Sequence, residues 1–263
     1  MNLAHSLIDT HFHVFDAGQA MPGARYVPAY GVSLPMGQAA SKALGVGRGV
    51  LVQPSFLGTD NRRLVQELSS HPAILRGVAV VGPNVSKAEM LQLHACGVRG
   101  IRLNLAGQSH DPGGWPSAHP LWETMASLHW HIELHTGTGA LPEVLAWLPA
   151  GLTVVLDHMG KPNQVAAHDR CVQAAVRRAH RQAVYVKLSS AYRLEGRNAQ
   201  SLARLWLSEL GADRLLWGSD WPCTNHEKEA NYPQLLLALH DWVGGPAQRR
   251  AQVDNPGKLY DFA

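Results

Sequence analysis

The sequence predicts a single-domain α/β protein, a (β/α)8 barrel of the TIM type over residues 1–263. Short β-branched or leucine-rich runs alternate eight times with longer amphipathic segments, which is the pattern of repeated strand–helix units. The length of 263 residues suits one such barrel. The turn after the first apolar run, "HVFDAGQAMPG", lacks a Gly-rich phosphate-binding pattern, which argues against a doubly wound open sheet.

Predicted strands and helices alternate along the whole chain. We expect strands near residues 8–14, 49–53, 75–81, 98–105, 131–135, 153–158, 184–189 and 215–219. Helices are expected near residues 36–45, 60–70, 86–96, 117–129, 140–148, 164–182, 198–210 and 230–243, with another close to the C-terminus. Ser86 and Glu89 form a capping box that predicts where the third helix begins.

Composition excludes several classes of protein. Hydrophobic residues make up 46% and charged residues 16% of the chain, which indicates a large core and not a disordered chain. The net charge of +3, with no Lys/Arg run on a predicted helix, argues against nucleic-acid binding. No apolar stretch has the roughly 20 residues that a membrane helix needs, and no signal-peptide pattern is present. Three scattered cysteines favour a reducing compartment, so we expect a cytoplasmic protein.

Polar side chains end most of the predicted strands, at the face where barrel enzymes carry their active sites. They belong to seven different strands: His11 and His13, Gln53 and Ser55, Arg102 and Asn104, His135, His158, Lys187 and Ser189, and Asp220. An ordinary hydrophobic core would not gather so many polar groups at one mouth. The sequence therefore predicts a functional site there.

The stretch "IDTHFHVFD" places two histidines on one face of the first strand, with Cα atoms roughly 6.5 Å apart. His11 and His13 could hold a metal ion, a water or a carboxylate, or each could be a hydrogen-bonded structural histidine. In a closed barrel strand eight neighbours strand one, so Asp220 comes within reach of both. The ordinary alternative for Asp220 is a helix N-cap.

Three further expectations concern residues near this mouth. Lys187 is expected to pair with a nearby acid. Asp157 precedes His158, so strand alternation predicts that it faces the helix layer as a capping or ion-pair residue. The long loop over residues 20–35, with Tyr26 and Tyr30, is a candidate lid, although simple loop packing would explain both tyrosines as well.

The motifs "DTHFH", "QPSFLGTDN", "IRLNL", "LDHMGKP", "LWGSDWP" and "NPGKLYDF" follow one another in the order and spacing of the amidohydrolase superfamily. The sequence resembles the branch that contains the 2-pyrone-4,6-dicarboxylate lactonases and related lactone hydrolases. This resemblance covers residues 9–262 and implies hydrolysis of a lactone by water that Asp220 activates. By the same resemblance His11, His13 and His158 would surround the water and the scissile carbonyl.

Substrate-binding residues follow from the same motifs. Ser55 and Arg102 match positions that bind carboxylate or carbonyl oxygens in the pyrone lactonases. Lys161 stands where those enzymes tend to have arginine, and His135 where they have tyrosine, so both roles depart from the family pattern. A guanidinium can grip a carboxylate bidentately, which favours a small anionic lactone as substrate, with Arg193 as a second clamp or else a solvated loop charge.

The role of His135 decides the expected cofactor. Many amidohydrolases bind one divalent ion, whereas the pyrone-dicarboxylate lactonases look metal-independent. Zn²⁺ or Mn²⁺ would suit a site formed by His11, His13, His135 and Asp220. The sequence favours a metal-bound site and a metal-free site equally. In either mode the oxyanion would be stabilised, by the ion or by His158, Lys161 and Arg102.

Other functions stay open at this point. A metal-dependent decarboxylase of the same superfamily and an aldonolactone hydrolase are the alternative enzymes. A barrel that only binds an acidic ligand is disfavoured, because binding alone needs no aspartate positioned among histidines. Neither the substrate nor a homo-oligomeric state follows from the sequence.

Overall fold

Eight parallel strands form the centre of the molecule in the computed structural model, which describes residues 6–110 and 112–262. Residues 1–5, 111 and 263 of the predicted domain lie outside the described residues. Each strand pairs with the next in chain order, so the predicted (β/α)8 architecture is confirmed. The strands are β1 (Leu7–Phe12), β2 (Val46–Val52), β3 (Leu75–Ala79), β4 (Val98–Asn104), β5 (His131–His135), β6 (Val154–Leu156), β7 (Val184–Leu188) and β8 (Leu215–Trp217).

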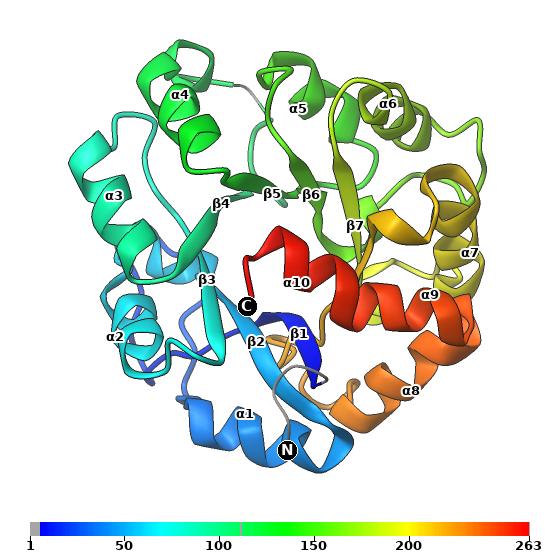
Figure 1. The fold of residues 1–263 in the computed structure, drawn as a ribbon, viewed down its shortest axis with the longest axis horizontal. Helices are drawn as coiled ribbons and strands as arrows, with labels where there is room; N and C mark the ends of the chain where they lie inside the picture. Colours follow the sequence, from blue (N-terminus) through cyan, green and yellow to red (C-terminus); the bar gives the residue numbers. More distant parts are fainter. Residues whose placement is uncertain (1–5, 111, 263) are drawn as a thin grey trace.

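Helices surround the strands on the outside (Figure 1). One α-helix lies in each of the connections from β1 to β8, and α8 follows β8: α1 (Leu34–Ser41), α2 (Arg62–Ser70), α3 (Lys87–Ala95), α4 (His119–Ser127), α5 (Leu141–Trp147), α6 (Arg170–Ala179), α7 (Ala199–Leu210) and α8 (Tyr232–Val243). At the start of α3 the Ser86 hydroxyl accepts a hydrogen bond from the Glu89 backbone N–H at 3.1 Å, as the capping box predicts.

The C-terminal segment covers the end of the barrel where the strands begin (Figure 1). It consists of α9 (Gly245–Arg249), a π-helical turn (Arg250–Asp254) and α10 (Asn255–Leu259). Tyr260 reaches from there into the barrel and donates to Glu133 at 2.9 Å. The functional mouth therefore lies at the opposite end.

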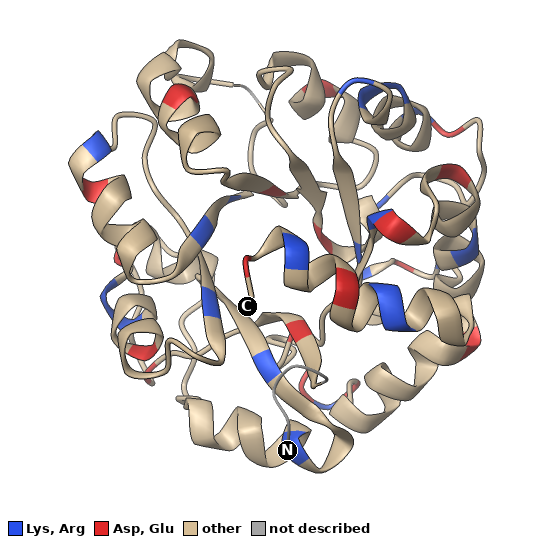
Figure 2. Cartoon of the chain, in the orientation of Figure 1, with Lys and Arg blue, Asp and Glu red and all other residues tan. Residues whose placement is uncertain are grey.

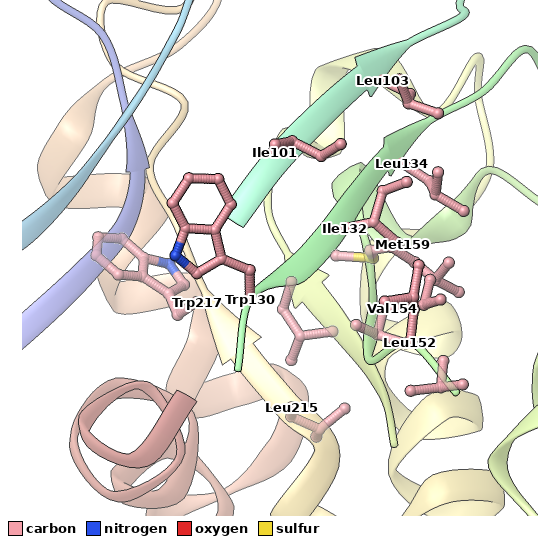
Figure 3. Close-up of a cluster of buried hydrophobic side chains, with 14 of the residues drawn as sticks. Ile101, Leu103, Trp130, Ile132, Leu134, Leu152, Val154, Met159, Leu215 and Trp217 are labelled. Carbon is pink, nitrogen blue, oxygen red and sulfur yellow. The ribbon is translucent and has the colours of Figure 1, made fainter. Parts of the chain in front are cut away.

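Hydrophobic side chains fill two separate layers. The outer layer lies between sheet and helices and includes Ile101, Ile132 and Leu134 (Figure 3). The inner layer fills the barrel with Val50, Val52, Val78, Val155, Leu216 and Tyr260. Together they anchor the strands that carry the polar residues.

On the outer surface, basic and acidic residues are interspersed around the ring of helices (Figure 2). A membrane-spanning helix, which would have to be both long and apolar, does not occur among the residues that the structure describes.

The barrel closes between β1 and the segment after β8. Thr10 Oγ1 donates to the Trp217 carbonyl at 2.7 Å, and the Asp220 N–H donates to the His11 carbonyl at 2.7 Å. Strand β1 changes register between Asp9 and Phe12. Near this register change, the Asp9 carboxylate accepts hydrogen bonds from Ser219 and Tyr232. The side chain of His11 faces the polar interior of the barrel, where it contacts Asp157.

Strands β6 and β8 are shorter than expected, ending at Leu156 and Trp217 and not at residues 158 and 219. His158 and Asp220 have positive backbone angles, with φ of 50° and 59°, which an extended strand does not contain. The chain therefore leaves the sheet before these two residues.

Candidate active site

A cavity of about 310 Å³ opens at the C-terminal ends of the strands. Seven of the predicted site residues line it: His13, Ser55, Arg102, His135, His158, Arg193 and Asp220. His11 is fully buried directly behind this lining. Lys161 does not line the cavity, and its Nζ lies 3.7 Å from Glu195. The structure thus brings all but one of the expected residues to one place.

Asp220 is the carboxylate at the centre of this cavity. Its Oδ2 accepts three hydrogen bonds, from Ser190 Oγ at 2.8 Å, Tyr192 Oη at 2.9 Å and Arg193 Nε at 2.8 Å. Burial alone would raise the pKa of Asp220, but the Arg193 charge and hydrogen bonding hold it well below its usual value. Asp220 is therefore ionised and held through Oδ2 by three donors, while Oδ1 faces His11 and His13.

His11, in β1, and His13, directly after it, face the other oxygen. Oδ1 of Asp220 lies 3.3 Å from His13 Nε2 and 3.5 Å from His11 Nε2. His13 Nδ1 donates to the Val52 carbonyl at 2.7 Å, and its Nε2 lies within hydrogen-bond distance of Asp220 Oδ1. Burial, followed by the nearby Lys187 charge, lowers the pKa of His11 to about 4, which keeps its ring neutral.

His135 and His158 lie edge to face beside this centre, with ring centroids 4.6 Å apart. Burial lowers the pKa of both rings well below the usual value, so both are neutral. His158 Nδ1 lies 3.0 Å from Ser189 Oγ, and His135 Nδ1 lies 3.4 Å from Arg102 Nη2. The Nε2 atom of His135 is buried and has no partner among the described residues, so it is available to a ligand.

Left-handed backbone conformations place the residues that follow β6, β7 and β8. His158, Met159, Gly160 and Lys161 form a continuous left-handed turn, with φ between 43° and 66°. Ser190 and Asp220 have φ of 53° and 59°. Such angles cost non-glycine residues roughly 1–2 kcal/mol each, so the surrounding fold must hold them in place.

A network of buried charges lies beneath the histidines. Lys187 Nζ lies 2.6 Å from Glu133 and 3.4 Å from Asp157, so the expected pairing of Lys187 with an acid is confirmed. Although burial opposes ionisation of Glu133, the Lys187 charge lowers its pKa to about 2. Asp157 also contacts His11 Nδ1 at 3.3 Å and accepts from Arg102 Nε at 2.8 Å.

The expected position of Asp157 is wrong. Its side chain faces the barrel interior and not the helix layer, because it lies two residues after Val155, which is also an interior residue. His158 reaches the same interior only because the chain turns left-handed there. Simple alternation fails at this strand end, so both neighbours point inward.

Two of the three arginines that line the cavity are ion-paired with acids of this chain. Arg102 pairs with Asp157, and Arg193 pairs with Asp220, each at 2.8 Å. Each charge is therefore already compensated, although the guanidinium N–H groups that the acid does not use can still donate to a substrate oxygen. Sequence reasoning had treated both as uncompensated charges.

Side chains at this centre fit one divalent ion. Ligand atoms of His11, His158 and Asp220 all lie within 4.8 Å of one another. Of the expected ligands, His13 and His135 are not part of this group, and His158 joins it instead. A tetrahedral zinc with bonds of about 2.0–2.1 Å has ligand atoms about 3.3 Å apart, close to the 3.5 Å between Asp220 Oδ1 and His11 Nε2. A second group, His11, Glu133 and Asp157, does not fit a cation because Lys187 occupies it.

Several site residues were not expected from the sequence. Ser190 and Tyr192 hold Asp220, and Arg25 and Gln108 line the cavity. "SSAYR" directly follows a predicted strand, which was an available signal for Ser190 and Tyr192. Arg25 lies in a long loop, where sequence gives no register, so only the folded loop shows its position.

Comparison with known proteins identifies the class to which this site belongs. The amidohydrolase family model matches residues 8–262, and the chain belongs to this family. It is 33% identical to a 2-pyrone-4,6-dicarboxylate hydrolase of Comamonas testosteroni, over 96% of this chain and 89% of the relative. It is 30% identical to a 4-sulfomuconolactone hydrolase of Rhizobium radiobacter, with the same coverage of 96% and 89%.

Solved structures give the same assignment. A Pseudomonas putida structure described as a 2-pyrone-4,6-dicarboxylic acid hydrolase is 34% identical, with a TM-score of 0.87 and 99% of both chains covered. A structure from Acinetobacter baumannii with the same description and bound citric acid is 30% identical, with a TM-score of 0.86 over 98% of this chain and 100% of the other. The resemblance predicted from the sequence motifs is confirmed.

Proposed function

We propose that this protein is a lactonase, a hydrolase that opens a small anionic lactone by attack of water on the ring ester. The observation that carries the proposal is the geometry of Asp220, which is fixed through Oδ2 and presents Oδ1 to the cavity between two histidines. The two curated relatives are named as hydrolases of a dicarboxylated and a sulfonated lactone, which supports a cyclic ester with an anionic group.

The attacking water lies at Asp220 Oδ1 and is oriented by His11 and His13. As the water oxygen bonds to the lactone carbonyl carbon, Asp220 accepts one of its protons. The ring C–O bond then breaks, and the leaving oxygen takes the proton held by Asp220, which completes the hydroxy acid and regenerates the carboxylate. Because Oδ2 is held by three donors, the carboxylate keeps its orientation throughout.

Negative charge on the carbonyl oxygen is stabilised by donors at the opposite wall. Arg102 and the neutral rings of His135 and His158 line this part of the cavity. This corrects the expected set of cations, because His158 is neutral and Lys161 is turned to Glu195. Among the three residues expected to act as cations, only Arg102 combines a charge with access to the cavity.

A divalent ion fits the same centre, where His11, His158 and Asp220 would hold it. When bound, such an ion would polarise the carbonyl and lower the pKa of the water. The chain's own residues perform the other tasks in either case: Ser190, Tyr192 and Arg193 orient Asp220.

The decarboxylase alternative required His135 as a metal ligand. Since His135 stands outside the group of clustered ligand atoms and lies against Arg102, no observation favours that alternative. An aldonolactone would undergo the same ring opening and differs only in its substituents, so it belongs in the test.

The test is hydrolysis of 2-pyrone-4,6-dicarboxylate, 2-pyrone-5-carboxylate (coumalate) and D-glucono-1,5-lactone in water enriched in ¹⁸O. We expect enzyme-dependent ring opening of at least one anionic pyrone, with one ¹⁸O in the new carboxylate. Failure to open any of these rings faster than buffer would contradict the proposal.

Metal content is measured separately, by elemental analysis of protein purified without chelators and by assay before and after stripping. Bound Zn²⁺ or Mn²⁺ near one per chain, with activity lost on stripping and restored on addition, assigns the ion to the site. If the rate of hydrolysis is unchanged after the metal is stripped, then Asp220, His11 and His13 bind and activate the attacking water without a metal ion.

We also propose a reducing, cytoplasmic location, because Cys96, Cys171 and Cys223 are all unpaired. A thiol-alkylation assay on freshly lysed cells tests this, and three reactive thiols after denaturation are expected.

A further inference from the structure

The charges that line the cavity do not balance. Three arginines and one acid line it, and two of these arginines are paired: Arg102 with Asp157 behind the wall, and Arg193 with Asp220. The third, Arg25, has no carboxylate within 4.0 Å among the described residues. The lining therefore carries one uncompensated positive charge.

Arg25 is held in position although it lies in a loop, between β1 and α1. Its Nη1 donates to the Ala106 carbonyl in the connection after β4. The guanidinium lies against Gly107, whose φ is +68° and where a Cβ atom would clash with Nη1. The same loop packs through Tyr26 on Phe56, with ring centroids 5.9 Å apart. Because only Nη1 is used, Nε and Nη2 are left for a ligand.

Two amides from the β4 side join Arg25 at the cavity wall. Asn104 and Gln108 both line the cavity, and their side-chain amide N–H groups can donate to an anion. The Oδ1 atom of Asn104, which is buried without a hydrogen-bond partner among the described residues, is an acceptor that a water or a substrate hydroxyl would complete. Unsatisfied buried polar atoms are uncommon unless a ligand or water completes them. A guanidinium flanked by amides is well suited to a planar oxyanion.

We propose that Arg25, with Asn104 and Gln108, binds the anionic substituent of the substrate, and that the preferred substrate is a lactone with a single anionic group. This proposal rests on the lactonase function and names its substrate class. A second carboxylate would have to compete with Asp157 for Arg102, or with Asp220 for Arg193, and both pairs are short and mostly buried. The reacting end of the cavity is thus neutral overall, and the Arg25 end is cationic.

The test compares two pyrones that differ in one charge, coumalate and its methyl ester. Their dissociation constants are measured by stopped-flow mixing, before ring opening, with the wild-type chain, Arg25→Gln and Arg25→Lys. The control is Arg249→Gln, which also removes one positive charge, from α9 at the opposite end of the barrel. 2-Pyrone-4,6-dicarboxylate is included as a dianion.

We expect the wild type to bind coumalate at least tenfold tighter than the ester. Arg25→Gln should weaken coumalate binding roughly 10- to 100-fold and leave ester binding within about twofold, since only a charge-assisted contact is lost. Arg25→Lys should retain part of the preference, and Arg249→Gln all of it. The dianion should bind no more than about tenfold tighter than coumalate.

Equal losses for the two pyrones in Arg25→Gln, or no preference in the wild type, would overturn the anion site. A dianion that binds 100-fold tighter than coumalate would overturn the single-charge preference. These outcomes are independent of turnover. If discrimination is present but no lactone is hydrolysed, the lactonase function fails and the anion site stands; if hydrolysis proceeds without discrimination, the reverse holds.

Discussion

Two halves of the barrel supply the active site in different ways. In the first half, β1, β4 and β5 carry His11, Arg102 and His135 on the extended strands themselves. In the second half, His158, Ser190 and Asp220 come just after β6, β7 and β8, in left-handed conformations. The residues on extended strands have ordinary backbone angles and carry no conformational strain. Each of the three left-handed residues is strained by roughly 1–2 kcal/mol.

This difference explains how so many groups meet at one point. An extended strand shows the interior only every second residue, so it cannot present neighbours such as Asp157 and His158 together. A left-handed residue breaks the alternation and turns both inward. The left-handed turns after β6 and β8 therefore place His158 and Asp220 at the site, and strands β5 and β7 supply Glu133 and Lys187 beneath it.

The largest expected effect is on catalysis. Asp220→Asn should reduce kcat about 10³-fold, because the amide cannot accept a proton from water. Asparagine tolerates a left-handed φ, so the variant should keep its circular dichroism spectrum and a cooperative thermal transition. Steady-state kinetics on the hydrolysed pyrone measures the loss, with the exposed α8 residue Asp241→Asn as the control. Activity within tenfold of wild type would exclude Asp220 as the base.

Removal of a buried charge beneath the site should cost the most stability. Lys187→Met leaves Glu133 and Asp157 without their shared cation and should lower the free energy of unfolding by about 3–5 kcal/mol. Urea denaturation at pH 7 measures this, and the double variant Lys187→Met/Glu133→Gln should recover part of the loss. Arg250→Met, at an exposed pair with Asp213, should cost less than about 1 kcal/mol. A loss for Lys187→Met as small as this would show that the buried network is not stabilising.

Acid should destabilise the protein through the neutral histidines. The pKa of His11 is lowered to about 4, and those of His135 and His158 lie well below the usual value. Between these values and about 6.5 the unfolded chain binds more protons, so stability falls as the pH drops through 6.5. From pH 7 to 5.5 we expect a loss of about 1 kcal/mol per histidine, or roughly 3 kcal/mol in total.

Urea denaturation at the two pH values, in buffer with a chelator, measures this loss. The variant His158→Asn, whose new side chain tolerates the left-handed backbone, should lose about 1 kcal/mol less over the same interval. Stability that stays constant within about 0.5 kcal/mol would mean that these rings are not neutral in the folded state.

The smallest effect isolates the backbone strain itself. Lys161 has φ of 43°, so Lys161→Gly should be more stable than Lys161→Ala by about 1 kcal/mol. At Lys42, which is exposed and right-handed with φ of −60°, the order should reverse and alanine should be better. Thermal unfolding of the four variants checks this, and the same order at both sites would leave no evidence of strain after β6.

The tertiary structure confirms the sequence prediction for elements that follow simple periodicity. Alternating strand and helix patterns are set by local hydrophobic spacing, so the eight strands and the fold class could be predicted. The strand ends could not be predicted, because a positive φ at His158 or Asp220 is imposed by distant packing and hydrogen bonds and not by the residues themselves.

By itself, then, the sequence determined the barrel, the amidohydrolase family and the gathering of histidines with Asp220 at one mouth, because these follow from periodicity and from motif order. Only the tertiary structure decided which charged side chains of the active site form ion pairs with one another. Pairing of Arg102 with Asp157 and of Arg193 with Asp220, and the position of Arg25 against Gly107, depend on contacts between residues far apart in the chain. Coulombic compensation acts over a few ångströms in space, and distance along the chain does not report it.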